Sequence, residues 1–144
     1  MAEIAAVCIS EQKGTVKHPV EEIRLIPEHG IEGDAHAGKW HRQVSLLARE
    51  SVEVMEERIA APLDAGVFAE NILTRGIELK SLPIGTRLRI GTALAEVTQI
   101  GKECHADCEI RRKTGDCVMP REGIFVRILE EGTARAGDAV EVVA

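Results

Sequence analysis

Three of the four cysteines lie within fourteen residues of one another, among charged side chains. Cys104 follows a predicted strand and a turn at Gly101, which would place its thiol at the rim of the fold and not in the core. Nearby Lys102 and the basic triplet 111–113 would favour the thiolate, the form that attacks sulfur and ligates soft metals. We therefore predict that Cys104 is reactive, with Cys108 or Cys117 as the second thiol that a sulfur carrier needs.

Two other interpretations of these cysteines stay open. One is a zinc ion held by Cys104, His105, Cys108 and Cys117, although C-x3-C-x8-C is not a recognised zinc motif. The other is that the thiols are simply buried, as we expect for Cys8 between apolar neighbours in the first predicted strand. Because no secretory signal is visible, we expect reduced thiols and a cytoplasmic protein.

A second group of candidate residues lies in segment 26–44, the longest stretch without a strand or helix pattern. From Ala35 to Arg49 the chain has no acidic residue, although its net charge is −6. Long loops on compact domains commonly carry function, and a local excess of donors suits a phosphate or another anion. The basic side chains in question are His36, Lys39, His41, Arg42 and Arg49. A solvated loop, or a metal held by Asp34 and the two histidines, are the alternatives.

Several smaller features accompany this loop. Gly30, Gly33 and Gly38 fit backbone that needs a positive φ or a close approach to a ligand, but they do not form a nucleotide-binding motif. The pair Glu70-Asn71 precedes a predicted strand and would serve either as a turn cap or as a pocket wall. Arg121 precedes another strand and could also hold an anion.

Period-two alternation of apolar residues dominates the rest of the chain, and it predicts short half-buried strands. The expected strands are Glu3–Ser10, Thr15–Lys17, Ile23–Leu25, Val44–Leu47, Asn71–Thr74, a hairpin over Arg87–Ile100, Ile124–Leu129 and Ala139–Val143. A helical period appears over Arg49–Ala60, where Pro62 ends it, and a second helical turn is expected at Cys108–Lys113. Many strands with one or two short helices indicate a mainly β, closed or partly closed barrel, and 144 residues indicate a single domain, 1–144.

Composition excludes two classes of partner. The net charge of −6 and the presence of only Trp40, Phe68 and Phe125 as aromatic residues argue against nucleic acid, which requires a basic face and stacking platforms. The apolar run Ile4–Ile9 is far shorter than the roughly 20 residues of a spanning helix, so no membrane segment is expected.

Taken in order, these motifs resemble MOSC domains, named after the C-terminal domain of molybdenum cofactor sulfurases. The resemblance runs from about Val7 to the end of the chain. The matching residues are Gly30–Asp34 with His36 and Gly38, Phe68 with Glu70-Asn71, Gly85 to Gly91, Cys104, Gly123 to Leu129, Gly132, and Gly137-Asp138.

The resemblance implies a β-barrel that binds the molybdenum cofactor, a pterin dithiolene with a phosphate tail. The family's single hallmark cysteine corresponds to Cys104 as the molybdenum ligand, with Cys108 as the fallback, and both are the expected catalytic residues. The family's glycine-rich basic loop corresponds to Gly30–Arg42. The expected cofactor-binding residues are Gly33, Asp34, His36, Lys39, His41, Arg42, Glu70, Asn71, Lys102 and Arg121.

Three roles follow from this resemblance. The first is cofactor sulfuration, maturation or delivery, with the reactive cysteine as metal ligand or persulfide carrier and with a cysteine desulfurase or a molybdoenzyme as partner. The second is a molybdenum-dependent reductase of N-hydroxylated substrates, which would need a separate electron donor because the sequence has no flavin or iron–sulfur motif. The third is a non-catalytic module that stores or carries the cofactor.

Overall fold

Short strands make up most of the fold, as the alternating sequence predicts. A computed structural model of the chain describes residues 2–12, 16–101 and 122–143. The strands are β1 Glu3–Ile9, β2 His18–Val20, β3 Ile23–Ile26, β4 Gly30–Ile31, β5 Val44–Ala48, β6 Ile72–Arg75, β7 Arg87–Ile90, β8 Ala93–Ile100, β9 Ile124–Glu130, β10 Gly132–Ala134 and β11 Val140–Val143. The helix α1 spans Arg49–Ile59, and a 3-10 turn, η1, spans Leu79–Ser81. The mainly β class is confirmed.

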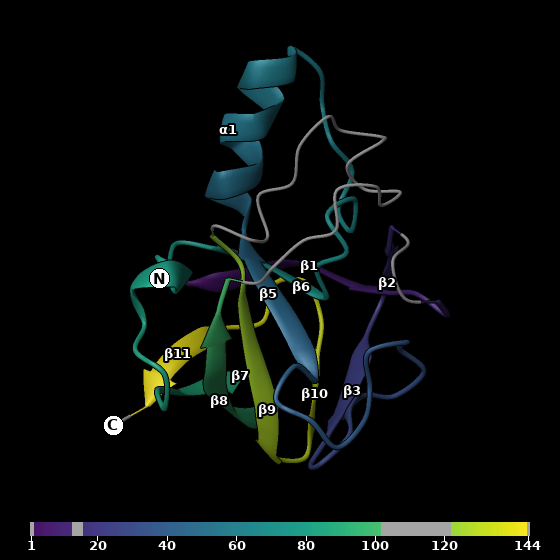
Figure 1. Cartoon of the computed structure of the whole chain (residues 1–144), viewed down its shortest axis with the longest axis vertical. Helices are drawn as coiled ribbons and strands as arrows, with labels where there is room; N and C mark the ends of the chain where they lie inside the picture. The colour runs from purple at the N-terminus through teal and green to yellow at the C-terminus, as the bar shows by residue number, and fades with distance from the viewer. Residues whose placement is uncertain (1, 13–15, 102–121, 144) are drawn as a thin grey trace.

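Two sheets share the strands. The larger has eight strands in the order β11-β7-β8-β9-β5-β6-β1-β2, and the smaller has three in the order β10-β3-β4. Neighbouring strands are antiparallel except β5 and β6, which run parallel with Leu46 opposite Ile72. Helix α1 makes the crossover that a parallel pair requires, and Figure 1 shows it rising directly from the end of β5.

Of the two predicted forms, the fully closed barrel does not form, because the two sheets are not closed into a barrel in the part of the chain that the structure describes. Strand β11 reaches the start of β1 through one isolated bridge, Glu3 to Ala139. The nitrogen of Ile4 also donates to the oxygen of Asp138 at 2.8 Å. The same edge of β1 is occupied further along by β2, which pairs with Val7 to Ile9. Only the first residues of β1 are therefore open to β11.

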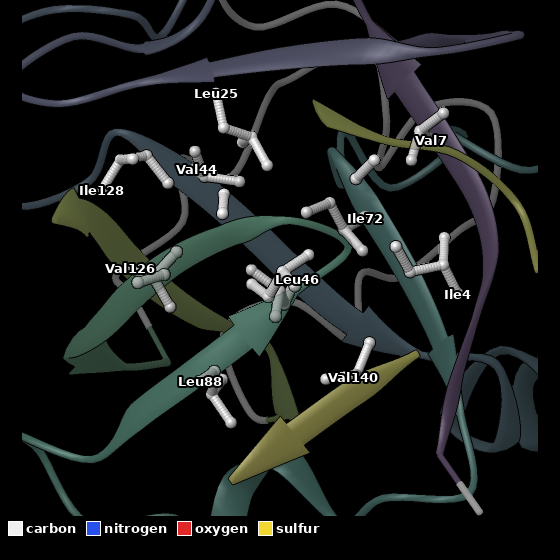
Figure 2. Close-up of a cluster of buried hydrophobic side chains, with 14 of the residues drawn as sticks. Ile4, Val7, Leu25, Val44, Leu46, Ile72, Leu88, Val126, Ile128 and Val140 are labelled. Carbon is white, nitrogen blue, oxygen red and sulfur yellow. The ribbon is translucent and has the colours of Figure 1, made fainter. Parts of the chain in front are cut away.

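The apolar side chains form two cores on opposite faces of the larger sheet. The main core lies inside the curve of the two sheets, where Leu46 and Ile72 are fully buried beside side chains from most of the other strands (Figure 2). The second core lies under α1 and contains Leu47, Leu73 and Phe125. Strands β5 and β6 are therefore covered on both faces, which explains why the adjacent residues Leu46 and Leu47, and likewise Ile72 and Leu73, are all apolar.

The helix follows its predicted pattern, with one difference at its end. Val52 and Met55 are buried against the second core, but Ile59, expected on the same stripe, is 38% exposed. The helix ends at Ile59 and is capped by Ala60, which adopts a left-handed conformation and donates its backbone N–H to the backbone oxygen of Glu56. The described residues contain no helix that is both long and apolar enough to cross a membrane.

Three elements differ from expectation. The strand predicted at Thr15–Lys17 is wrong in its described part, since the strand begins at His18 and Lys17 instead turns its side chain into the protein. Strands β4 and β10 were not predicted, because two or three residues are too few to show a period. The second helical turn, expected at residues 108–113, lies outside the described residues.

Candidate functional site

The loop between β4 and β5, residues 32–43, is the candidate site, and we call it the basic loop. It consists of successive tight turns, tied to the end of β1 by a hydrogen bond from Ala35 N to Ser10 O at 2.8 Å. Gly33 has φ +86° and Gly30 has φ +107°. A Cβ at Gly30 would lie 2.9 Å from the carbonyl oxygen of Gln43. Both glycines are therefore required by the backbone, as predicted.

A buried ion pair forms the base of the loop. The ammonium of Lys17 lies 2.8 Å from Oδ1 of Asp34, and neither side chain is exposed. The carboxylate also accepts hydrogen bonds from the backbone nitrogens of Ser10, at 3.1 Å, and of His36, at 3.0 Å. Burying two charges is tolerated only when they are paired and hydrogen-bonded in this way. The Asp34 charge is thus balanced internally and does not oppose an anion at the loop.

The aromatic side chain of Trp40 arranges two basic neighbours. Its ring stacks on His36 with centroids 6.3 Å apart and planes 6° from parallel, and its Nε1 donates to the carbonyl oxygen of His36 at 2.7 Å. The guanidinium carbon of Arg42 lies 4.8 Å from the centroid of Trp40 and 5.7 Å from that of Phe125. Both distances are within the range of a cation–π contact. Trp40 therefore holds His36 and Arg42 in defined positions.

Arg42 has an unsatisfied donor. Its Nε is buried and has no hydrogen-bond partner among the residues that the structure describes. Leaving a buried donor unpaired costs free energy, more so on a charged group. Among the basic side chains of the loop, Arg42 is the one whose geometry calls for an additional acceptor.

The end of β8 lies against the loop. Nε2 of His41 lies 2.8 Å from Oε1 of Gln99, and the amide nitrogen of Gln99 donates to the oxygen of Gly101 at 2.7 Å. The hydroxyl of Thr98 donates to the carbonyl oxygen of His41. Lys102, a predicted site residue, follows Gly101 directly in the sequence and lies outside the described residues.

A cavity of about 280 Å³ opens beside the loop, lined by Glu28, Lys39, Trp40, His41, Gln43 and Arg127. A cavity of about 420 Å³ lies elsewhere, between α1 and η1. Its charged lining consists of Glu50, Glu78, Glu122 and Lys80. Its excess of carboxylates opposes an anion, whereas basic side chains outnumber the single carboxylate in the smaller cavity. The charge therefore favours the smaller cavity as an anion site.

Glu70 and Asn71 have structural roles, and neither lines the described part of the basic loop. Both side chains are fully buried. The Glu70 carboxylate accepts the backbone N–H groups of Gly66 at 2.7 Å and Phe68 at 3.1 Å, which makes it a turn cap. Asn71 accepts the N–H of Ser45 and donates to the oxygen of Cys8, linking β5 to β1. Of the two interpretations open from the sequence, the structure supports the turn cap, and the expected pocket wall is not formed by these residues.

Burial of Glu70 predicts a pH-dependent stability. Burial raises the pKa of this carboxyl from 4.5 to about 7, while the backbone donors and Lys17 lower it in part. The folded state thus binds a proton more tightly than the unfolded state, so the stabilisation is complete below pH 4.5 and is lost as pH rises through 7. The free energy of unfolding should fall by about 3 kcal/mol across this window because of Glu70.

Chemical denaturation of the wild type and Glu70→Gln at several pH values tests this expectation. The amide keeps the shape of the neutral carboxyl but does not titrate. The difference in stability between the two proteins should therefore shift in favour of the variant as pH rises through 7. An unchanged difference over this range contradicts the raised pKa.

The other predicted residues divide into two groups. The structure brings Gly33, Asp34, His36, Lys39, His41 and Arg42 together in the basic loop. Lys102, Cys104, Cys108 and Arg121 lie outside the described residues, as do His105 and Cys117. Cys8 is fully buried as expected, and burial raises the pKa of its thiol to about 12.

Residues absent from the sequence prediction complete the site: Ser10, Lys17, Trp40 and Gln99. Lys17 is 17 positions away from Asp34, and no local pattern connects them. A tryptophan within a basic loop was the one available signal, since a large aromatic ring in an otherwise polar segment indicates packing. The alternative of a metal at Asp34, His36 and His41 is not supported, because no three ligating side chains converge among the described residues.

These features define a strand-rich domain with a basic, glycine-containing loop at one end of its larger sheet. The sequence matches the model of the MOSC domain over residues 33–141. The chain belongs to the MOSC domain family. The resemblance predicted from the sequence is therefore confirmed.

One sequence relative and two solved structures illustrate what this chain is similar to. The chain is 25% identical to the uncharacterized protein YflK of Bacillus subtilis (strain 168), over 92% of this chain and 64% of YflK. It thus spans less than two thirds of the length of that relative. The crystal structure of the YuaD protein from Bacillus subtilis has a TM-score of 0.79 at 20% identity, covering 99% of this chain and 96% of YuaD. The crystal structure of YiiM from Geobacillus stearothermophilus has a TM-score of 0.79 at 22% identity, covering 100% of this chain and 76% of YiiM. Both structures share the fold.

Proposed function

We propose that this chain binds the molybdenum cofactor at the basic loop and acts in the sulfuration, maturation or delivery of that cofactor. MOSC domains are associated in general with molybdenum cofactor binding or sulfurase-like function. The observation that carries the proposal is the buried Nε of Arg42, which has no partner among the described residues and is held beside Trp40 in a loop whose buried carboxylate, Asp34, is already neutralised.

The residues present fit the phosphate of such a cofactor. Arg42 supplies a planar donor group suited to a phosphate oxygen, and Lys39 supplies an exposed ammonium at the cavity wall. His36 contributes a ring N–H donor on the same loop, and His41, whose Nε2 bonds to Gln99, lines the cavity. No acidic residue occurs between Ala35 and Arg49, so the segment carries no charge that would oppose the ligand.

The thiols complete the proposal. Cys104 would ligate the metal or carry a sulfane sulfur, and Cys108 would be the second thiol. The cofactor, when bound, supplies a molybdenum centre at which oxygen or sulfur atoms are exchanged. The chain's own contribution is to hold the phosphate tail and to present a thiolate.

The test is elemental analysis with pterin fluorescence on protein expressed in a host that makes the cofactor. Wild type should retain stoichiometric molybdenum and pterin, and Cys104→Ser should lose the metal while remaining folded. Arg42→Met should bind the cofactor at least about tenfold more weakly, since a charge-assisted hydrogen bond contributes about 1.5–3 kcal/mol.

A matched control separates the site from a general loss of charge. Arg75 is exposed on β6, 3.6 Å from Glu3, and Arg75→Met should retain the cofactor as well as wild type. If Arg42→Met retains as much cofactor as this control, the basic loop is not the binding site. Zinc in place of molybdenum, or no pterin in the wild type, rejects the proposed function.

A further inference from the structure

Lys17 makes a third contact that the ion pair does not require. Its ammonium lies 2.8 Å from Asp34 Oδ1, 3.1 Å from Ser10 Oγ and 3.1 Å from Nδ1 of His36. The hydroxyl of Ser10 donates to the oxygen of Gln12 at 3.0 Å, which leaves its lone pairs to accept from Lys17. Each of these three atoms can accept one N–H of an ammonium group.

The contact with His36 determines where the ring carries its proton. An ammonium donates and never accepts, so Nδ1 can bond to Lys17 only as an unprotonated acceptor. Asp34 Oδ2 lies 3.8 Å from the same nitrogen, which is too far for a hydrogen bond to compete. A ring whose Nδ1 is unprotonated carries its hydrogen on Nε2, on the opposite edge.

The rest of the ring is held in place by other contacts. The backbone N–H of His36 donates to Asp34 Oδ2 at 3.0 Å, the carbonyl oxygen accepts from Trp40, and the ring stacks on Trp40. The imidazole is 23% exposed, whereas Lys17 is fully buried. The edge that bears Nε2 is therefore directed away from the buried ammonium.

We infer that Lys17 is a positioning residue that fixes His36 as the neutral Nε2–H tautomer, so that His36 donates a hydrogen bond to the phosphate group of a ligand at the basic loop. This inference rests on the proposed function for the identity of the ligand. It changes the expected role of His36, because the ring acts as a neutral donor and not as a cation. Lys17 lies outside the residues matched by the family model, 33–141.

The tautomer is measured first, on the wild-type protein without ligand. Nitrogen chemical shifts of isotope-labelled histidine should show His36 with a bare Nδ1 and a protonated Nε2 at neutral pH. A protonated Nδ1, or an imidazolium with both nitrogens protonated, overturns the inference. This measurement does not depend on cofactor binding, so it remains decisive if the proposed function fails.

Variants then connect the tautomer to binding. Lys17→Met removes the ammonium N–H donors but keeps an unbranched apolar side chain. Without a donor at Nδ1, His36 should become a mixture of the two neutral tautomers. The affinity for inorganic phosphate, used as the probe, should fall about tenfold, the value of one hydrogen bond of about 1.4 kcal/mol. Lys80 is an exposed lysine outside the loop, so Lys80→Met should change neither the His36 tautomer nor the phosphate affinity.

The outcomes distinguish the two proposals. If the tautomer is as expected but phosphate does not bind to wild type, the proposed function fails and the role of Lys17 in setting the tautomer holds. If Lys17→Met keeps a single Nε2–H tautomer, the inference is wrong whatever the phosphate result. If Lys17→Met does not fold, two other measurements test the inference: the tautomer of His36 in the wild type and the phosphate affinity of His36→Ala. An unchanged phosphate affinity in His36→Ala overturns the donor role of His36.

Discussion

Replacing Asp34 by alanine should lower the free energy of unfolding by about 3–5 kcal/mol, the usual cost of removing one partner of a buried ion pair. The ammonium of Lys17, with no exposed surface, would lose its counterion. The backbone N–H groups of Ser10 and His36 would also lose their acceptor. Urea denaturation followed by circular dichroism measures the change.

Two controls test the cause of this loss. Lys17→Met combined with Asp34→Ala removes both charges, so the double variant should be more stable than Asp34→Ala alone. Glu131→Ala breaks an exposed pair, in which Arg24 and Glu131 are 2.6 Å apart and each about half exposed, and should cost no more than about 1 kcal/mol. Equal losses of stability in Asp34→Ala and Glu131→Ala would show that the buried Lys17–Asp34 pair contributes no more to stability than an exposed ion pair.

Gly66→Ala is expected to destabilise the protein by about 3 kcal/mol or more. Gly66 has φ +90°, and an added Cβ would overlap the carbonyl oxygen of Lys17 and lie 2.6 Å from its carbonyl carbon. The backbone cannot easily retreat, because the nitrogen of Lys17 donates to the oxygen of Gly66 at 2.8 Å. The substitution should therefore also displace Lys17 and weaken phosphate binding.

Gly85→Ala is the matched control for this effect. Gly85 has φ +96°, close to that of Gly66, but nothing lies within 4 Å of the position that its Cβ would take. It should show only the conformational cost, about 1 kcal/mol. Thermal unfolding of the two variants separates strain from overlap, and similar losses in both would contradict the close contact at Lys17.

The elements were predicted well wherever a local pattern exists. Alternation gave the hairpin of β7 and β8, whose register pairs Leu88 with Ala95, and the helical period gave α1. The errors follow from the same physics. Strand β4 is too short to show a period, and Lys17 was assigned to a strand because a buried lysine has no local signature.

The basic loop was predicted in part from the sequence, whereas the contacts that organise it were not. Its composition alone indicated an anion site, since the glycines and the absence of acidic residues from Ala35 onward are properties of a continuous segment. The residues that organise it are distant in the chain. Ser10 and Lys17 come from the end of β1 and the segment before β2, and Gln99 comes from β8.

The sequence by itself determined the mainly β class, the helix after β5 and the local excess of basic residues, because each depends on neighbours a few positions apart. The order of its motifs along the chain also indicated the resemblance to MOSC domains. The tertiary structure alone decided that the sheets stay open, that Glu70 and Asn71 are buried supports, and that Lys17 neutralises Asp34 and faces His36. These outcomes depend on which strand edges are already paired and on which distant charges must be buried together, and no local period encodes either.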